Sequence, residues 1–200
     1  MSTRHRAEPL APEDRKKAIV EAVIPLLLTQ GPNTTTAQMA DAAGIAEGTI
    51  FRVFPDKGAL VHEAIRSCLD PAPTLEQIAG IERDLPLEIK LRKAAAIIIQ
   101  RSEKVHALAA VLRSLPTPGQ SHHQDTHKAV VEANSHIFWA LTRVFRDDAD
   151  RLAVEPARAA AAFRGLLFAV SFPLSDPDEL ITADEAIEIL LDGVVKRASA

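Results

Sequence analysis

The sequence lacks most of the features that mark secreted, membrane-spanning or redox-active proteins. Among its 200 residues Cys68 is the only cysteine, so no disulfide can form within one chain, and a lone thiol is typical of a reducing compartment. The apolar runs, such as 22–28 and 94–99, are far shorter than the roughly 20 residues that cross a bilayer. Residues 1–17 are polar and have no signal-peptide pattern. We therefore expect a soluble, cytoplasmic protein that makes no membrane contact.

Motifs of catalysis are missing as well. The chain has no glycine-rich phosphate-binding loop and no Gly-x-Ser-x-Gly sequence. His62 and Glu63 could begin a zinc-protease helix, but Arg66 stands where that motif needs its second histidine. We therefore expect neither an enzyme nor a bound cofactor.

One cluster of histidines leaves a metal site open. His123 and His127 are four residues apart, next to His122, and this spacing would place the pair on one face of a helix. Such spacing is common by chance, and the segment follows a loop at 116–120. We favour a solvated helix start without metal, and a small metal-dependent enzyme is kept as an alternative.

The chain also has no surplus of basic residues. Its formal net charge is −4, and residues 1–70 hold eight Lys or Arg against nine Asp or Glu. This balance argues against a protein that coats nucleic acid through bulk basicity. Any DNA binding must therefore be local, and it must depend on where particular residues lie.

Signals for β-strands are scarce, whereas helical signals recur along the chain. There is no Tyr and little alternating β-branched sequence, but apolar residues such as Ile19, Val23 and Leu27 follow helical spacing. These blocks are separated by proline-containing breaks. We predict an all-α chain of about nine helices, the last one marked by a capping box of Thr182 and Glu185. The charged stretch 146–151 is interpreted as a solvated helix end.

The most informative stretch is residues 34–60, TTTAQMADAAGIAEGTIFRVFPDKGAL. Thr35 or Thr36 can cap a short helix, which Gly44 ends in a tight turn. A second helix begins near Ala46. Helix, glycine turn and helix in this order are typical of the helix-turn-helix, whose second helix fits the major groove of DNA.

The second helix of this motif has one apolar and one polar face. Helical geometry places Ile50 and Phe54 on the buried side, and Gly48, Thr49 and Arg52 on the outward side. Small outward residues allow the backbone to approach DNA closely. Two packed helices without DNA-binding function are the alternative that this pattern alone leaves open.

The segment resembles the TetR family of bacterial repressors over about residues 12–70. That family's signature joins a capping threonine, an Ala-Gly turn, a Gly-Thr pair, an aromatic residue, a terminal Phe and a lysine. The corresponding residues here are Thr35, Ala43-Gly44, Gly48-Thr49, Phe51, Phe54 and Lys57. The resemblance implies a flexible arm at 1–11, a three-helix DNA-binding domain at 12–58 with its helix-turn-helix at 35–54, and a helical ligand-binding and dimerisation domain at 59–200.

The resemblance also implies which residues meet DNA. Thr35, Thr36 and Lys57 would contact phosphates, which fixes the register of the complex without reading sequence. The residues in or beside the groove would be Glu47, Gly48, Thr49, Phe51, Arg52 and Val53, with base reading by Arg52 and Thr49. Arg4 and Arg6 could reach an adjacent groove, although a solvated terminus is the favoured interpretation.

Three positions depart from the family's pattern. Phe51 stands where Tyr is common, so one hydroxyl contact is lost, and Ala37 stands where a basic residue is frequent. Glu47 places an acid at the reading end, where it could accept from a cytosine amine or serve the helix dipole. We expect a modest operator affinity and an unusual operator sequence.

For the C-terminal domain the residues give weaker guidance. A small-molecule effector site could be lined by aromatic and polar side chains, with ordinary core packing as the alternative for each aromatic: His136, Phe138, Trp139, Arg143, Phe163 and Phe168. The small-residue run at 157–162 and the apolar stripe of the last helix are suited to close helix packing. In the resembled family the last two helices form the homodimer interface, and we adopt that expectation here.

These inferences combine into one functional hypothesis. We expect the chain to be a DNA-binding transcriptional regulator, a repressor that is released from a double-stranded, palindromic operator by a small, largely apolar effector. A helical ligand-binding or protein-interaction module without specific DNA binding is the alternative, and the acidic balance of the chain supports it.

Overall fold

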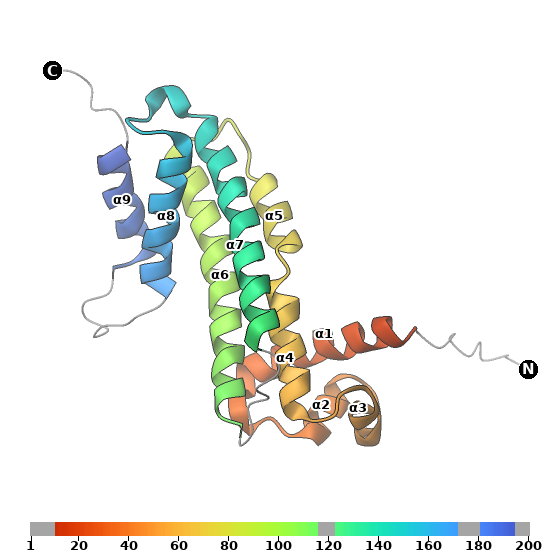
Figure 1. The fold of residues 1–200 in the computed structure, drawn as a ribbon. Coiled ribbons are helices and arrows are strands. Elements are labelled where there is room, and N and C mark those ends of the chain that lie inside the picture. Colours follow the sequence, from red (N-terminus) through yellow and green to blue (C-terminus); the bar gives the residue numbers. More distant parts are fainter. Residues whose placement is uncertain (1–10, 116–122, 172–180, 195–200) are drawn as a thin grey trace, which may run out of the picture. The chain divides into compact units, whose positions relative to one another are not determined.

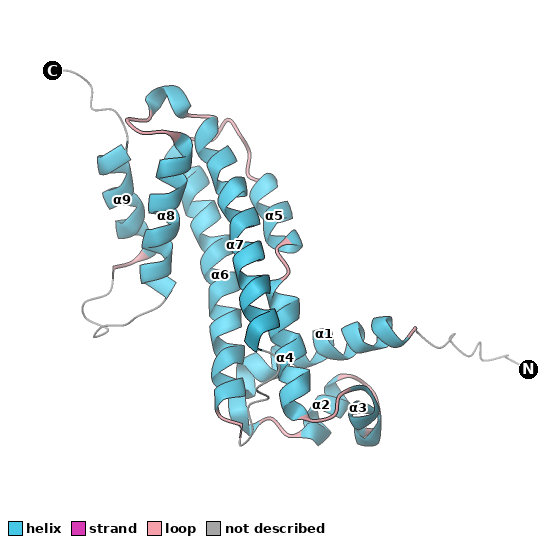
Figure 2. Ribbon diagram, in the orientation of Figure 1, coloured by secondary structure: helices cyan, strands magenta, loops and turns pink. Residues whose placement is uncertain are grey.

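The computed structural model describes residues 11–115, 123–171 and 181–194, and in these ranges it contains helices and no strand (Figures 1 and 2). This confirms the predicted all-α class. None of the described helices is long and apolar enough to cross a membrane. The elements are α1 (Pro12–Gln30), η1 (Gly31–Asn33), α2 (Thr36–Ala42), α3 (Glu47–Val53), α4 (Lys57–Leu69), α5 (Ala72–Ala79), α6 (Leu87–Arg113), α7 (His123–Arg146), η3 (Ala149–Arg151), α8 (Pro156–Ser171) and α9 (Ala183–Val194).

The described residues fall into two compact units. The first unit comprises those within 1–67 and 107–122, and the second unit those within 68–106 and 123–200. Helices α4 and α6 each contribute residues to both units. The domain boundary predicted between residues 58 and 59 stays a prediction, and residues 1–10 of the predicted arm lie outside the described ranges.

The first unit is built on the apolar face of α1. This helix begins at Pro12, whose missing N–H costs nothing at a helix start, and it ends at Gly31, which has a φ of 59°. The buried residues of α1 recur at helical spacing: Ile19, Val20, Val23 and Leu27. The next three helical segments contribute further buried apolar residues to this unit: Met39 of α2, Ile50 of α3 with Phe54 just after it, and Leu60 and Val61 of α4. Lys16 of α1 also pairs with Glu63 of α4 at 3.0 Å. The short helices α2 and α3 are therefore held by burial against longer ones.

The core of the second unit joins α5 to α9. Phe145 of α7 and Phe163 of α8 are fully buried, and their rings meet edge to face with centroids 6.0 Å apart. Ala159 and Ala160 are buried as well, so α8 presents small side chains to its neighbours. Helix α8 packs against both α7 and α9. Phe168 of α8 and Ile189 of α9, by contrast, are exposed.

The start of α9 follows its predicted capping box. The Thr182 hydroxyl accepts from the Glu185 backbone N–H at 3.2 Å, and Glu185 Oε2 accepts from the Thr182 N–H at 2.7 Å. The Thr182 N–H and the Thr182 hydroxyl both donate to Glu185 Oε2, and these two hydrogen bonds lower the pKa of Glu185. Ile187 and Leu190 of the predicted stripe are buried, whereas Ile189 lies on the opposite, exposed side. The prediction for the helix start is confirmed.

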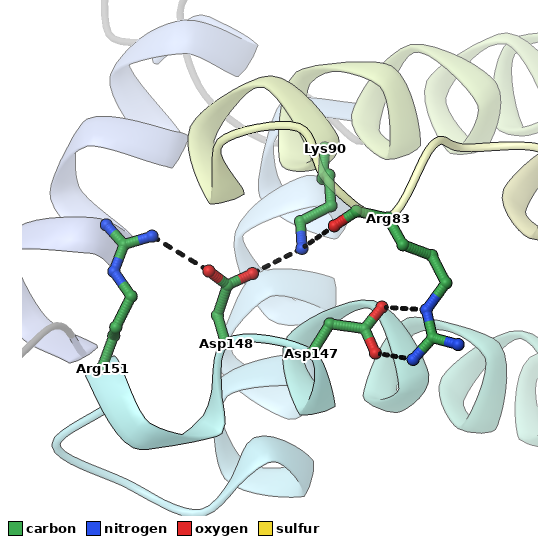
Figure 3. Close-up of polar contacts among 5 residues, drawn as sticks. All are labelled: Arg83, Lys90, Asp147, Asp148 and Arg151. Carbon is green, nitrogen blue, oxygen red and sulfur yellow. Dashed lines mark hydrogen bonds and ion pairs between the residues drawn. The ribbon is translucent and has the colours of Figure 1, made fainter.

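The acidic pair at the end of α7 corrects one prediction. The stretch 146–151 is not simply a solvated helix end, because Asp148 is buried and pairs with Lys90, whose side chain is only 3% exposed (Figure 3). Lys90 also donates to the Arg83 carbonyl at 3.3 Å, and Arg151 donates to Asp148 at 2.9 Å. Lys90 could not be recognised as this partner from the sequence, because it lies 58 residues from Asp148. Buried charges need such partners.

Candidate DNA-binding surface

Helix α2 begins at a complete capping box. The Thr35 hydroxyl accepts from the Gln38 backbone N–H at 3.2 Å, and the Gln38 side chain accepts from the Thr35 N–H at 2.8 Å. Of the two threonines considered, Thr35 is therefore the cap. Gln38 was missed in the sequence, although Thr followed three residues later by Gln is a known signal of a helix start. Met39 and Ala40, in the next turn, are buried.

The turn between α2 and α3 depends on Gly44. Its φ is +65°, in the left-handed region, and its N–H donates to the Asp41 carbonyl at 3.0 Å. An added Cβ would meet no atom within 4 Å, so the requirement for glycine comes from the backbone conformation and not from crowding. The predicted role of Gly44 is confirmed.

Helix α3 divides into the two faces that the sequence predicted. Ile50 is 1% exposed and Phe54, which caps the helix end, is also buried. Gly48 and Arg52 are exposed on the other face, and Thr49 is half-buried. Phe51 is 50% exposed, which is unusual for so large an apolar side chain. Helix α3 is therefore held in place by its buried face, and its opposite, narrow face is accessible.

The remaining predicted DNA-contact residues border this face. Glu47 is exposed in the first turn of α3, and Val53 is half-buried in its last turn. On α2, Ala37 is exposed and Thr36 is half-buried. The structure thus places the residues predicted for DNA contact on α2, α3 and their flanks within the first unit, at accessible or partly accessible positions.

Lys57 has an intramolecular role that the sequence did not reveal. It opens α4, as predicted, and its ammonium donates to the carbonyls of Pro32 at 2.9 Å and Thr34 at 2.6 Å. Partial desolvation lowers the pKa of Lys57. The side chain therefore fastens the segment before α2 to the start of α4. An ammonium has three N–H donors, so a contact to phosphate remains compatible with these two bonds.

The residues predicted to line an effector site do not lie together. His136, Trp139 and Arg143 line one cavity of about 410 Å³ formed by α5, α6 and α7, and Phe168 lines a second cavity, of about 360 Å³, formed by α6, α7 and α8. Phe163 is fully buried against Phe145 and belongs to the core. Phe138 is half-buried and carries the guanidinium of Arg164 at 5.4 Å from its ring centre.

The histidine cluster considered for a metal lies outside the described side chains. His122 lies outside the described residues, and the side chains of His123 and His127 at the start of α7 lie outside them too. Within the part of the chain whose side chains are described, no group of three or more His, Cys, Asp or Glu could hold a metal ion.

Comparison with known proteins agrees with this geometry. The family model for bacterial regulatory proteins of the tetR family matches residues 19–64, which span most of α1 through α3 and the first turns of α4. A putative TetR-family transcriptional regulator from Mesorhizobium loti has 16% sequence identity and a TM-score of 0.60, and the alignment covers 94% of this chain and 100% of that one.

Two further solved structures have the same fold. NalD of Pseudomonas aeruginosa, the secondary repressor of the MexAB-OprM multidrug efflux pump, has 22% identity and a TM-score of 0.52 over 92% of this chain and 98% of its own. The ketosteroid transcriptional regulator KstR2 of Mycobacterium tuberculosis has 18% identity and a TM-score of 0.51 over 92% and 96%. Residues 19–64 thus match the DNA-binding domain of the tetR family of bacterial regulatory proteins, and the chain has the fold of solved TetR-family regulators.

Proposed function

We propose that this protein is a homodimeric transcriptional repressor that leaves a roughly palindromic operator when a small effector binds its helical domain. The observation that supports this function best is the division of α3, in which Ile50 and Phe54 anchor a helix whose opposite face carries Gly48 and Arg52. That division suits a recognition helix in a major groove. Reading DNA in a bacterium also implies a cytoplasmic site of action.

Base recognition is assigned to the exposed face of α3. The Arg52 guanidinium can donate to the O6 and N7 atoms of guanine, and Thr49 can offer its methyl group to thymine. Phe51 offers an accessible apolar ring in the same helix, suited to contact with a thymine methyl or a sugar. Thr35, Thr36 and Lys57 are assigned to phosphates, which position the helix. Ala37, Glu47 and Val53 border these contacts.

The dimer is assigned to α8 and α9. Within one chain these two helices pack together and leave Phe168 and Ile189 exposed, beside small residues such as Gly165 and Ala169. Small and apolar residues on a helix pair suit close packing against the same pair of a second copy, with two-fold symmetry. A two-fold dimer would place two recognition helices on successive major grooves.

Release by an effector follows from differential binding. A ligand in the second unit would favour a conformer in which α4, which belongs to both units, carries the two recognition helices out of register. Ligand and operator then oppose each other reciprocally. A coupling of about 1–3 kcal/mol, equal to roughly 5- to 150-fold in affinity, is sufficient to regulate binding.

Arg52→Ala should relax the sequence preference of the protein. Losing a bidentate contact to guanine costs about 1–3 kcal/mol at the preferred base, while binding to unrelated DNA changes little. The measurement is a gel-shift titration with fragments selected from genomic DNA, at two salt concentrations. Arg146→Ala removes an exposed arginine at the end of α7 and serves as the charge-matched control. Equal preference in Arg52→Ala and wild type would refute the assignment of α3 as the reading helix.

Lys57→Ala should lower both stability and operator affinity. The variant loses two hydrogen bonds from a charged donor to the Pro32 and Thr34 carbonyls, and each such bond contributes about 1.5–3 kcal/mol. If the ammonium also contacts a phosphate, the slope of log binding constant against log salt concentration becomes shallower by about one unit in the variant. This change should be the same for every DNA sequence. Lys57→Arg, which keeps the charge, is the control. An unchanged salt slope in Lys57→Ala would leave the lysine a purely structural role.

A DNA-independent helical module is the outcome that would replace this function. It would be indicated if no genomic fragment gave a specific, salt-sensitive band, although the protein was folded and dimeric.

A further inference from the structure

The cavity between α6, α7 and α8 has a chemical character that the other cavity lacks. It has a volume of about 360 Å³, within the range of small-molecule sites, and four apolar side chains contribute to its wall: Ile98, Ile137, Leu167 and Phe168. Two arginines, Arg101 and Arg164, line it as well. Among the described residues of its lining none is acidic. The lining therefore combines apolar walls with two cations, and the acid that acts on Arg101, Asp70, lies outside it.

Arg101 of α6 is partly engaged and partly unused. Its Nη2 group donates to the carbonyl of Leu69, the last residue of α4, at 2.9 Å. Its Nε–H is buried and has no hydrogen-bond partner. Desolvation lowers the pKa of Arg101, but a guanidinium remains protonated in a protein. A buried donor on a charged group without a partner is costly, and such atoms are rare in native proteins.

A second orphaned atom belongs to the same cavity. The hydroxyl of Ser171, at the end of α8, is buried and makes no hydrogen bond. Ser102 and Asn134 also contribute to the lining. Arg164, the other arginine of the lining, donates to the Asn134 carbonyl at 3.3 Å and lies over the Phe138 ring. Its guanidinium therefore already has contacts within the chain. Arg101 and Ser171 are thus the two lining residues with unused buried donors.

The cavity formed by α5, α6 and α7 differs in how its cations are satisfied. Arg83 and Lys90 are paired with Asp147 and Asp148 (Figure 3), and its other two cations, Arg143 and Arg146, are exposed. The hydrogen bond from Arg83 lowers the pKa of Asp147, as expected for a carboxylate that stays ionised beside a cation. No buried donor without a partner is found among its described lining residues. The cations of this cavity are therefore either paired or exposed, and none of them offers a buried donor without a partner.

We propose that the effector is an amphipathic monoanion, of the carboxylate class, whose head group accepts from Arg101 Nε and the Ser171 hydroxyl while its apolar body lies against Ile98, Ile137 and Phe168. The proposal rests on the function given above and specifies the chemistry of its ligand. A single charge is indicated because, among the described lining residues, only the guanidinium of Arg101 has a buried N–H without a partner. Through the same guanidinium the head group would be linked to the Leu69 carbonyl at the end of α4.

The test compares carboxylates with neutral analogues of the same shape. Straight-chain alkanoates from butanoate to dodecanoate, and phenylacetate and 4-phenylbutanoate, are titrated into the full-length dimer by calorimetry, each beside its primary amide. Hydrogen bonds to a charged donor predict that at least one carboxylate binds about tenfold or more tightly than its amide. If no member of the series has this preference, the proposal is overturned.

Variants assign the preference to the proposed residue. Arg101→Gln should reduce the carboxylate-to-amide ratio to less than about twofold, and Ser171→Ala should reduce it by a smaller factor, with thermal unfolding measured for each. Arg143→Gln, an arginine of the other cavity, is the matched control and should leave the ratio unchanged. If Arg101→Gln fails to fold, Ser171→Ala and the wild-type ratio still decide the question. A ratio lost in Arg143→Gln but kept in Ser171→Ala contradicts the site.

Operator binding is measured on the same preparation, so that two failures can be told apart. Specific operator binding without carboxylate preference refutes the ligand class and leaves the regulator intact. Carboxylate preference without any operator binding supports the ligand class and refutes the regulatory function.

Discussion

Ile189→Glu is expected to convert the protein into a monomer and to lower operator affinity by about 10²- to 10⁴-fold, the usual gain from binding two sites at once. Ile189 is 56% exposed on α9, on the side opposite the buried Ile187 and Leu190. In the proposed dimer this face is covered by a second copy, so a glutamate there would bury an unpaired charge twice, once from each chain. Analytical ultracentrifugation gives the oligomeric state, and gel shift gives the affinity.

The control for this variant is Val131→Glu on α7. Val131 is 54% exposed, almost the same as Ile189, but it lies on a helix to which no dimer contact is assigned. This variant should remain dimeric and keep its operator affinity. A dimer that survives Ile189→Glu but dissociates in Val131→Glu would move the interface from α9 to α7.

Lys90→Met should destabilise the protein by about 3–5 kcal/mol, because it leaves a buried carboxylate without its main cation. Asp148 accepts from Lys90 and from Arg151, but the Arg151 side chain is largely exposed and is screened by solvent. Methionine has a length and volume close to those of the lysine stem, so lost packing contributes little. Urea unfolding, monitored by circular dichroism, measures the change.

The double variant Lys90→Met with Asp148→Leu distinguishes an unpaired charge from lost packing. Because both charged groups are then gone, most of the stability should return, as it does when a buried ion pair is replaced as a whole. Arg83→Met, which removes the exposed partner of Asp147, should destabilise the protein far less than Lys90→Met, because solvent screens that pair. A cost that stays above 3 kcal/mol in the double variant would show that packing and not charge dominates at this site.

The structure of the helix-turn-helix was predictable from the sequence because the residues that specify it lie close together in the chain. Thr35, Gly44 and the Ile50–Phe54 spacing lie within 20 residues, and each one specifies a backbone feature by its own chemistry: a cap, a positive φ and a buried face. The capping box of Thr182 and Glu185 is local in the same way. Where a short segment specifies its own structure, its sequence is sufficient to predict it.

Features that depend on distant partners were not predictable. Asp148 looks like one of several surface acids until Lys90 is seen beside it, and Lys57 looks like a free cation until the carbonyls of Pro32 and Thr34, 23 to 25 residues earlier, are located. Arg101 carries no motif at all. Its importance comes from burial and from an unused N–H, and neither property is written in the neighbouring residues.

The predicted effector residues illustrate the same limit. Aromatic residues on two helices can point into a cavity, into the core or to solvent, and the choice depends on how the helices are rotated about their axes. Phe163 points into the core and Trp139 toward one cavity, while Phe168 lines another. A periodicity identifies the faces of a helix, but it does not say which neighbour each face meets.

The bond network of Lys57 has a mechanical consequence for any signal that reaches α4. The Lys57 ammonium is hydrogen-bonded to two carbonyls just ahead of α2. The first turn of α4 therefore cannot rotate without moving the start of the helix-turn-helix. Each helix-turn-helix would then move as a rigid body that keeps its internal structure. In the dimer proposed above, a ligand would therefore change the distance between two intact helix-turn-helix units, and with it their match to the helical repeat of DNA, without unfolding either unit.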